Sequence, residues 1–150
     1  MELIVRARIY PTESEFTVKN VLDKIYNFPE DAYTVRDAPN QIHKIIEAKA
    51  SGIQTLSMIH KKIREHKIVQ AFREELERNM DTLTGIIRFK LHKQALAVPS
   101  FHICQYEEES PLGPVEVEIH ARNIVEILNY LAPQTVKGVV QELPYVPNEE

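Results

Sequence analysis

The stretch RFKLHKQA, residues 88–95, decides the fold because it alternates apolar and basic side chains. Phe89 and Leu91 fall on one side of an extended chain with a period of two, which predicts a strand with one buried face. Arg88, Lys90 and His92 fall on the other side. The pattern therefore predicts a sheet that is covered on one side and displays positive charge on the other. The whole chain is nonetheless acidic, with a net charge of -4.

The composition is typical of a globular chain with one domain. Its 150 residues are 43% hydrophobic and 27% charged, which is enough for a sizeable hydrophobic core. The one cysteine, Cys104, cannot form an internal disulfide, and the N-terminus lacks the apolar core of a signal peptide. No segment approaches the roughly 18 apolar residues of a membrane-spanning helix. We therefore expect a cytoplasmic protein that does not span a membrane.

Several other segments have the character of strands. Residues 3–10 alternate between apolar and polar side chains until a proline stops them. Residues 42–50 fit a helix or a strand, and we favour a strand because a hairpin with the short run 32–37 suits the spacing. Three more strands are predicted in the second half of the chain, at residues 84–92, 97–105 and 115–120.

Helical periodicity marks the segments near both ends of the domain. Thr12 followed by Glu15 has the form of a capping box, which predicts a helix that ends by Phe28. Residues 121–132 carry an apolar stripe at helical spacing and are followed by a proline. The tail at residues 133–150 is Pro-rich and acidic, and we expect it to be loosely ordered.

The strongest helical pattern begins at Ile53. Apolar residues recur every three or four positions with no Pro or Gly between them, which predicts one helix of roughly 27 residues with Ser51 as its cap. A helix of that length spans roughly 40 Å, which exceeds the width of a small domain. It must either kink near residues 65–67 or project past the sheet.

The order of these elements predicts an α+β fold. The order is strand, helix, two strands, long helix, three strands and helix, so strands cluster and do not alternate strictly with helices. We expect a single domain over residues 1–132, with a largely antiparallel or mixed sheet and helices packed on one face. The side chains expected on the open face are Arg6, Arg8, Arg88, Lys90, His92, His102, Glu116, Glu118 and His120.

Two groups of basic residues are candidates for contact with RNA phosphates. One is the stretch HKKIREHK at residues 60–67, and the other lies on and just after the predicted strand at residues 84–92. The candidate contacts are Lys61, Lys62, Arg64, Lys67, Arg88, Lys90 and Lys93. The alternative is that both groups are solvated surface, with Arg6 or Arg8 paired across strands to Glu116 or Glu118.

Catalytic and metal-binding patterns do not stand out in the sequence. No serine elbow, phosphate-binding glycine loop or His pair at zinc-ligand spacing is present. The loop at residues 107–109 has three glutamates but lacks the spacing of a cation site. Cys104 is expected to be a buried apolar residue. We therefore expect no enzyme activity, no cofactor and no metal.

Four stretches carry a family resemblance. They are VRARIYPTE at 5–13, IREHKIVQAFREEL at 63–76, FKLHKQALAVPSFHI at 89–103 and EEESPLGPVEVEI at 107–119. The chain resembles, over residues 1–131, an archaeal family of small proteins that is classified as predicted RNA-binding and is related to a predicted exosome subunit. The most specific pieces are the Lys-Gln-Ala triplet at 93–95 and the Ser-Pro-Leu-Gly turn at 110–113. The resemblance implies a fold similar to that of the large-subunit ribosomal protein that binds 5S RNA.

The chain departs from the pattern of this family at several positions. His92 stands where the family usually has Asn, Leu96 stands where it usually has a second Ala, and residues 98–99 replace a Gly. The long helix has EHKIVQ at residues 65–70, where the family typically has Arg-Gln-Arg-Ile-Leu-Asp. The chain looks like a diverged member.

These observations predict a non-enzymatic RNA-binding accessory protein whose partner is RNA or an RNA–protein complex. The alternative is a protein-interaction module, in particular a homodimer, that uses the long helix or the open sheet face without nucleic acid. The apolar stripe of the long helix discriminates between them. If the stripe exceeds what the sheet covers, the surplus should be buried in a dimer.

Overall fold

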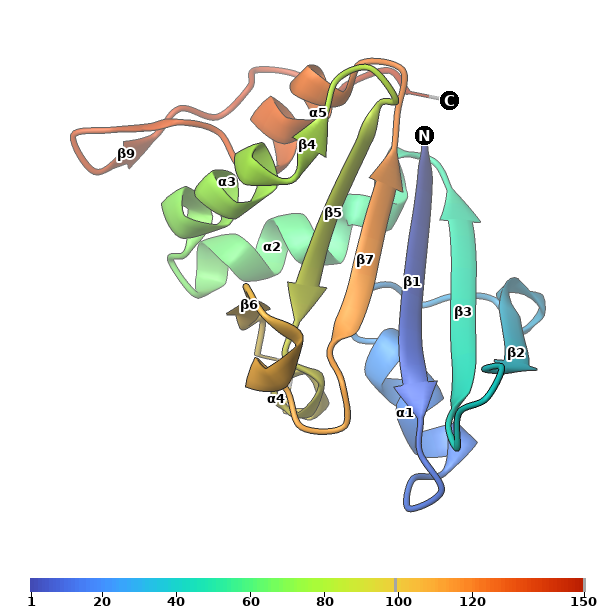
Figure 1. Cartoon of the computed structure of the whole chain (residues 1–150). Helices are drawn as coiled ribbons and strands as arrows, with labels where there is room; N and C mark the ends of the chain where they lie inside the picture. The colour runs from blue at the N-terminus through green and yellow to red at the C-terminus, as the bar shows by residue number, and fades with distance from the viewer. Residues whose placement is uncertain (99, 150) are drawn as a thin grey trace.

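The computed structural model describes residues 1–98 and 100–149 and has an antiparallel sheet of seven strands (Figure 1). Six strands follow each other in the order β2-β3-β1-β7-β5-β4, and β6 pairs with β5. The strands are β1 (Glu2–Ile9), β2 (Tyr33–Asp37), β3 (Lys44–Ser51), β4 (Met80–Asp81), β5 (Ile86–Leu91), β6 (Ile103–Cys104) and β7 (Val115–His120). The α+β prediction is confirmed, and the ambiguous segment at 42–50 forms strand β3.

The sheet has one apolar face and one polar face because its central strands alternate. In β5 the side chains of Ile87, Phe89 and Leu91 are buried, whereas Arg88 between them is exposed. Strands β1 and β7 alternate in the same way where they pair. Figure 1 shows α1 (Glu15–Leu22) and α2 (Ser57–Glu65) behind the sheet, and no helix in front of it. The expected open face is therefore present.

Helix α1 begins later than the sequence pattern indicates. Its cap is Ser14, whose side chain accepts a hydrogen bond from the backbone N–H of Thr17. The capping box predicted between Thr12 and Glu15 was therefore wrong. The helix ends at Leu22, and a short 3-10 helix (Glu30–Ala32) precedes β2.

The segment predicted as one long helix forms three shorter elements. Of the two alternatives, a kink near residues 65–67 or projection past the sheet, the structure shows the kink. A 3-10 turn (Ile53–Leu56) precedes α2, and α3 (Val69–Arg78) follows it after a break. The predicted cap was wrong, because Ser51 is the last residue of β3.

The break between α2 and α3 is a Schellman motif. The N–H of Ile68 donates to the carbonyl of Ile63 at 3.0 Å, and the N–H of Lys67 donates to the carbonyl of Arg64 at 3.1 Å. Lys67 has φ 55, the left-handed conformation that this motif requires at its turning residue. The break turns the chain so that both halves of the helical pattern pack on the same sheet.

The apolar stripe of α2 and α3 is covered within the chain. Ile59, Ile63, Phe72 and Leu76 are each 0% exposed, and Val69 is 4% exposed. Both helices therefore bury their apolar faces in the core of this chain. Neither leaves the exposed apolar surface that would favour a dimer.

The predicted strand at 97–105 was wrong over most of its length. The chain forms a short helix, α4 (Lys93–Ala97), and then only the two residues of β6. His92 starts α4, since its Nδ1 accepts a hydrogen bond from the N–H of Ala95 at 3.1 Å. Residue 99, inside the predicted strand, lies outside the described residues. A 3-10 turn (Glu107–Glu109) follows before β7.

The last elements are α5 (Ile124–Leu131) and a hairpin of β8 (Thr135–Val136) and β9 (Val139–Val140). The tail predicted to be loosely ordered makes contacts with the domain. Glu142 pairs with Arg64 at 2.6 Å, and Glu149 accepts hydrogen bonds from the backbone at the start of α5. The boundary at residue 132 stays a prediction. No helix in the described ranges is both long and apolar enough to cross a membrane.

The left-handed residue at the helix break gives a stability prediction. Replacing Lys67 with Gly should stabilise the protein by about 1 kcal/mol, because a side chain in this conformation is strained and glycine is not. The measurement is urea unfolding. Lys67→Ala removes the same charge but keeps the Cβ atom, so it should give no gain. A lower unfolding midpoint for Lys67→Gly than for the wild type would contradict the assignment.

Candidate nucleic-acid interface

Charges on the open sheet face alternate in sign across the strands. Glu47 of β3 lies opposite Arg6 of β1, Arg6 lies opposite Glu116 of β7, and Glu116 lies opposite Lys90 of β5. Arg6 also forms ion pairs with Glu47 and with Glu118, the latter at 2.6 Å. Cross-strand pairs of opposite charge stabilise a sheet and neutralise its surface. Most of the positive charge on the open face is thus neutralised by neighbouring glutamates. The pairing of Arg6 agrees with the alternative in which this face is solvated surface.

Glu118 is the centre of these ion pairs. Besides Arg6 it contacts His120 Nε2 at 2.7 Å and lies 3.6 Å from Arg88 Nε. Burial alone would raise the pKa of Glu118, but the hydrogen bonds from Arg6 and His120 and the charges of Arg6 and Arg88 hold this pKa below its ordinary value. The carboxylate is therefore ionised at neutral pH and keeps its three partners.

A hollow of about 420 Å³ lies where the open face meets the edge of β5. Arg88 and Lys90 line it together with Arg6, Glu116 and Glu118. The side chain of Arg88 is 60% exposed, and its one ion pair is long. Lys90 has no ion pair with any described residue. Arg88 and Lys90 are therefore the cations beside this hollow that remain available to a ligand.

The basic residues of α2 lie on the other side of the sheet. Lys61 and Lys62 both pair with Glu65, at 3.7 Å and 3.2 Å, and only Lys61 is mostly exposed. Lys67 is exposed at the helix break. Since α2 is behind the sheet in Figure 1, these residues and the open face point away from each other. One short RNA segment cannot contact both groups.

Arg64 is fully engaged in structural contacts. Its guanidinium pairs with Glu142 and donates to the carbonyls of His60, Tyr130 and Leu131. Burial and the charge of Arg64 lower the pKa of His60, so this ring adds no positive charge at neutral pH. The geometry of Arg64 removes the basis for its predicted phosphate contact.

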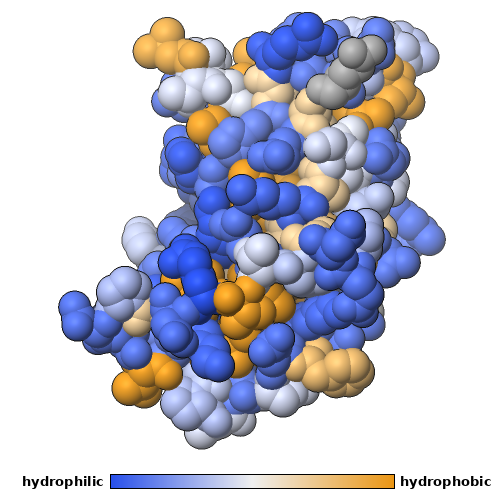
Figure 2. Space-filling view, turned by 90° about the vertical axis from the view of Figure 1, so that its right-hand side faces the viewer, coloured by the Kyte–Doolittle hydropathy of each residue, from blue (hydrophilic) through white to orange (hydrophobic). Residues whose placement is uncertain are grey.

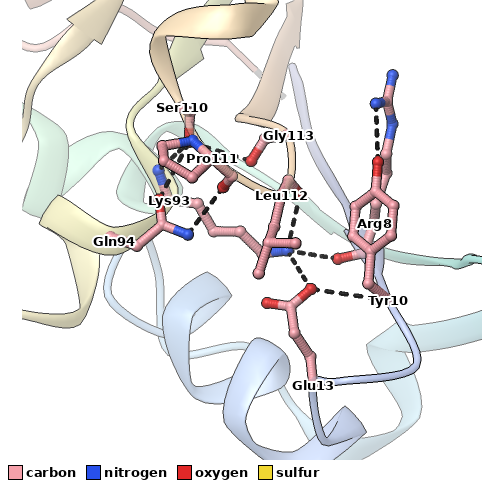
Figure 3. A network of polar contacts seen from close by, with 9 residues as sticks. All are labelled: Arg8, Tyr10, Glu13, Lys93, Gln94, Ser110, Pro111, Leu112 and Gly113. Atoms are coloured by element: carbon pink, nitrogen blue, oxygen red, sulfur yellow. Dashed lines mark hydrogen bonds and ion pairs between the residues drawn. The ribbon is translucent and has the colours of Figure 1, made fainter.

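Lys93 is buried, with 2% of its surface exposed. Figure 3 shows its ammonium group between the carbonyl of Arg8, the carboxylate of Glu13 and the carbonyl of Leu112. The three distances are 2.7, 2.8 and 3.2 Å. An ammonium group has three donors, and all three are used here. Lys93 therefore has a structural role, and its ammonium group has no free hydrogen to donate to a phosphate.

The rest of the two resemblance motifs packs around this lysine. Ser110 accepts a hydrogen bond from the N–H of Lys93 at 3.0 Å and donates to the carbonyl of Gly113 at 3.1 Å. Gln94 donates to the carbonyl of Pro111 at 2.8 Å. The Lys-Gln-Ala triplet and the Ser-Pro-Leu-Gly turn thus form one polar cluster at the end of β1 (Figure 3).

Glu13 is the ion-pair partner of Lys93, and the sequence pattern did not identify it. Its position just before α1 indicates a helix-dipole role, whereas its carboxylate binds Lys93 and the N–H of Tyr10. A buried lysine needs a carboxylate, but no spacing rule connects residues 80 positions apart. Among the described residues, no group of three His, Cys, Asp or Glu side chains could hold a metal ion. Cys104 is buried, as predicted.

Comparison with known proteins places this architecture in a family. The UPF0201 protein of Sulfurisphaera tokodaii is 30% identical over 149 residues, which are 99% of this chain and 99% of the relative. This chain belongs to the UPF0201 family. The UPF0201 protein of Sulfolobus acidocaldarius is 31% identical over 99% of this chain and 98% of its own. A family model with the description RNA binding matches residues 2–121, so the resemblance predicted from the sequence is confirmed.

Solved structures share the fold. A UPF0201 protein from Methanococcus jannaschii is 26% identical with a TM-score of 0.77, over 93% of this chain and 98% of its own. Mth689, a DUF54 protein from Methanothermobacter thermautotrophicus, is 15% identical with a TM-score of 0.64, over 87% and 96% of the two chains. At 15% identity, the likeness to Mth689 shows a shared fold and nothing about function.

The buried lysine gives a second stability prediction. Lys93→Met should lower the free energy of unfolding by about 3 kcal/mol, because it leaves the carboxylate of Glu13 without its partner in a mostly buried place. Lys90→Met, on the open face, is the matched control and should change stability by less than about 0.5 kcal/mol. Equal losses in the two variants by urea unfolding would refute the structural role of Lys93.

The ion pairs of Glu118 predict a dependence of stability on pH. A carboxyl whose pKa is lower in the folded state contributes stability above its unfolded pKa, and this contribution is lost as the pH falls through the folded pKa. Glu118→Gln removes the contribution. The unfolding midpoints of wild type and variant should therefore differ at about pH 7, and the difference should shrink as the pH falls below about 4.5. A difference that stays constant over this range would show that Glu118 does not titrate as described.

Proposed function

We propose that this protein is a non-enzymatic RNA-binding accessory factor whose contact surface is the open face of the sheet. The match of residues 2–121 to a family model described as RNA binding is the observation that carries the proposal. The geometry supports it, because Arg88 and Lys90 line a hollow at the edge of the open face, where Glu75 and Asn79 at the end of α3 form another wall. The partner is single-stranded RNA, alone or in an RNA–protein complex. The proposal includes a cytoplasmic location, where the lone thiol of Cys104 stays reduced.

The open face is a better candidate than the helix side for two reasons. On the helix side Lys61 and Lys62 share one glutamate, and Arg64 is occupied by Glu142 and three carbonyls. The helix side also has a hollow, of about 340 Å³, but of its two cations Arg64 is already engaged and only Lys67 is exposed. The hollow beside Arg88 and Lys90 offers two cations that are not engaged in this way. Phosphate contacts contribute most when cations are exposed and unpaired.

A charge-balanced surface binds RNA differently from a basic one. Its alternating charges contribute little long-range attraction, so affinity depends on a few local contacts and has a small salt dependence. This agrees with the net charge of -4, which would oppose binding by charge alone. We therefore infer that the protein contacts few phosphates.

The homodimer alternative has less support from the geometry. The apolar stripe that would have favoured it is buried in the chain's own core. Figure 2 shows the side of the molecule next to β2 as mainly hydrophilic, with apolar side chains in separate groups. A stable dimer interface usually has a continuous apolar centre. Oligomeric state stays a prediction that solution measurements test.

The proposal predicts a specific result in RNA-binding measurements. Fluorescence anisotropy with a labelled single-stranded RNA over a salt series should show binding that weakens as salt rises. Arg88→Ala/Lys90→Ala should weaken binding by about tenfold and lower the salt slope by about 1 to 2. Lys61→Ala/Lys67→Ala removes the same number of exposed charges from the helix side and should change affinity by less than about twofold.

Two outcomes would overturn the proposal. A loss confined to Lys61→Ala/Lys67→Ala would move the interface to α2. No binding of wild type at low salt, with folded protein, would retire the RNA function altogether. Light scattering for oligomeric state would then test the protein-interaction alternative.

A further inference from the structure

A second hollow on the open face has more positive charge than the first. Its volume is about 420 Å³, and Arg6, Arg8 and Arg36 line it together with His43 and one acidic residue, Glu116. It adjoins the first hollow, since Arg6 and Glu116 line both. Ile45 and Pro114 supply apolar surface.

Two arginines face each other across this hollow. The register pairs Arg36 of β2 with Ile45 of β3, and Ile45 with Arg8 of β1, so all three side chains lie on the same face. Strands in a sheet are spaced by about 4.8 Å, which places the two arginine backbones about 10 Å apart. Guanidinium groups on side chains of this length can reach one small anion from both sides.

Charge balance also fails at this second hollow, away from Arg88 and Lys90. Arg6 is neutralised by Glu47 and Glu118. The exposed side chain of Arg36 has no carboxylate partner among residues 1–98 and 100–149. Arg8 meets Glu107 only at 3.3 Å, and both side chains are partly exposed, so a stronger anion can replace that contact.

The buried lysine cluster fixes the position of Arg8. Lys93 binds the carbonyl of Arg8 at 2.7 Å, and the guanidinium of Arg8 donates to the hydroxyl of Tyr10 at 3.2 Å (Figure 3). A Cβ atom on Gly113 would lie 3.3 Å from Cδ of Arg8, so the turn packs against this side chain. The two resemblance motifs thus hold one wall of the hollow in place before any ligand arrives.

We propose that this hollow binds the terminal phosphate of a single-stranded RNA chain between Arg8 and Arg36. The proposal rests on the RNA-binding function proposed above and names the chemical group that the surface recognises. A terminal phosphate carries close to two negative charges at neutral pH, whereas each backbone phosphate carries one. A single unbalanced pair of guanidinium groups on a neutral face favours the group with the most concentrated charge. The apolar surface of Ile45 and Pro114 suits the adjoining ribose.

The test compares RNAs that differ only at one end. Short single-stranded RNAs of one sequence carry a phosphate or a hydroxyl at the 5′ end, with the fluorophore at the 3′ end, and a mirrored pair varies the 3′ end. Wild type should bind one phosphate-ended RNA about tenfold more tightly than its hydroxyl-ended partner. Arg36→Ala should reduce this ratio to about one. Lys67→Ala, which removes one exposed charge from the helix side, should retain the full ratio.

The outcomes separate this inference from the proposed function. Equal affinity of wild type for both ends in both pairs overturns the inference and leaves RNA binding intact. A ratio that survives in Arg36→Ala, with the variant folded as judged by thermal unfolding, also overturns it. Failure of every RNA to bind wild type at low salt overturns both proposals. If the affinities differ only in the pair that varies the 5′ end, the 5′ phosphate is the group recognised. If they differ only in the mirrored pair, it is the 3′ phosphate.

Discussion

One-sided burial of an antiparallel sheet is the constraint on which the rest of this structure depends. The alternation along β1, β5 and β7 sends every second side chain into a core that the helices behind the sheet cover, and leaves the intervening residues on a free face. A free face of this length needs charges for solubility, and neighbouring strands stabilise each other when those charges differ in sign. The balanced rows through Arg6 and Glu118 follow from this requirement. A binding function can then exist only where the balance is broken.

The polar cluster around Lys93 connects the fold to that place. It joins α4, the turn at 110–113, the end of β1 and the residue before α1, so four segments distant in sequence meet at one ammonium group. Burying an ammonium is unfavourable unless every hydrogen has an acceptor, which makes the geometry of the cluster specific. The same cluster orients Arg8. A motif that resembles those of an RNA-binding family therefore acts here by positioning its neighbours, with its own charge hidden.

The sequence predicted the elements whose signal is local. Period-two alternation located β1, β5 and β7, and helical spacing located α2 and α3. It left open whether the long helix kinks at residues 65–67, where Lys67 adopts a left-handed conformation, and it did not predict α4, which His92 caps. The candidate site was predicted in part, since Arg88 and Lys90 are on the open face. The burial of Lys93 and the placement of Arg36 and Arg8 on either side of Ile45 depend on long-range contacts and register, which no local pattern reports.

The most direct test of the account is to follow the side-chain Nε–H signals of the arginines by nuclear magnetic resonance while a short single-stranded RNA is added. The account predicts that the signals of Arg8, Arg36 and Arg88 shift, because these guanidinium groups line the open face. The signals of Arg64 and Arg73 should stay unchanged, because Arg64 binds Glu142 and the carbonyl of Leu131, and Arg73 binds Glu77 and the carbonyl of Ala132. Shifts confined to Arg64 and Arg73, or no shifts at all, would contradict the claim that the open sheet face is the surface that binds RNA.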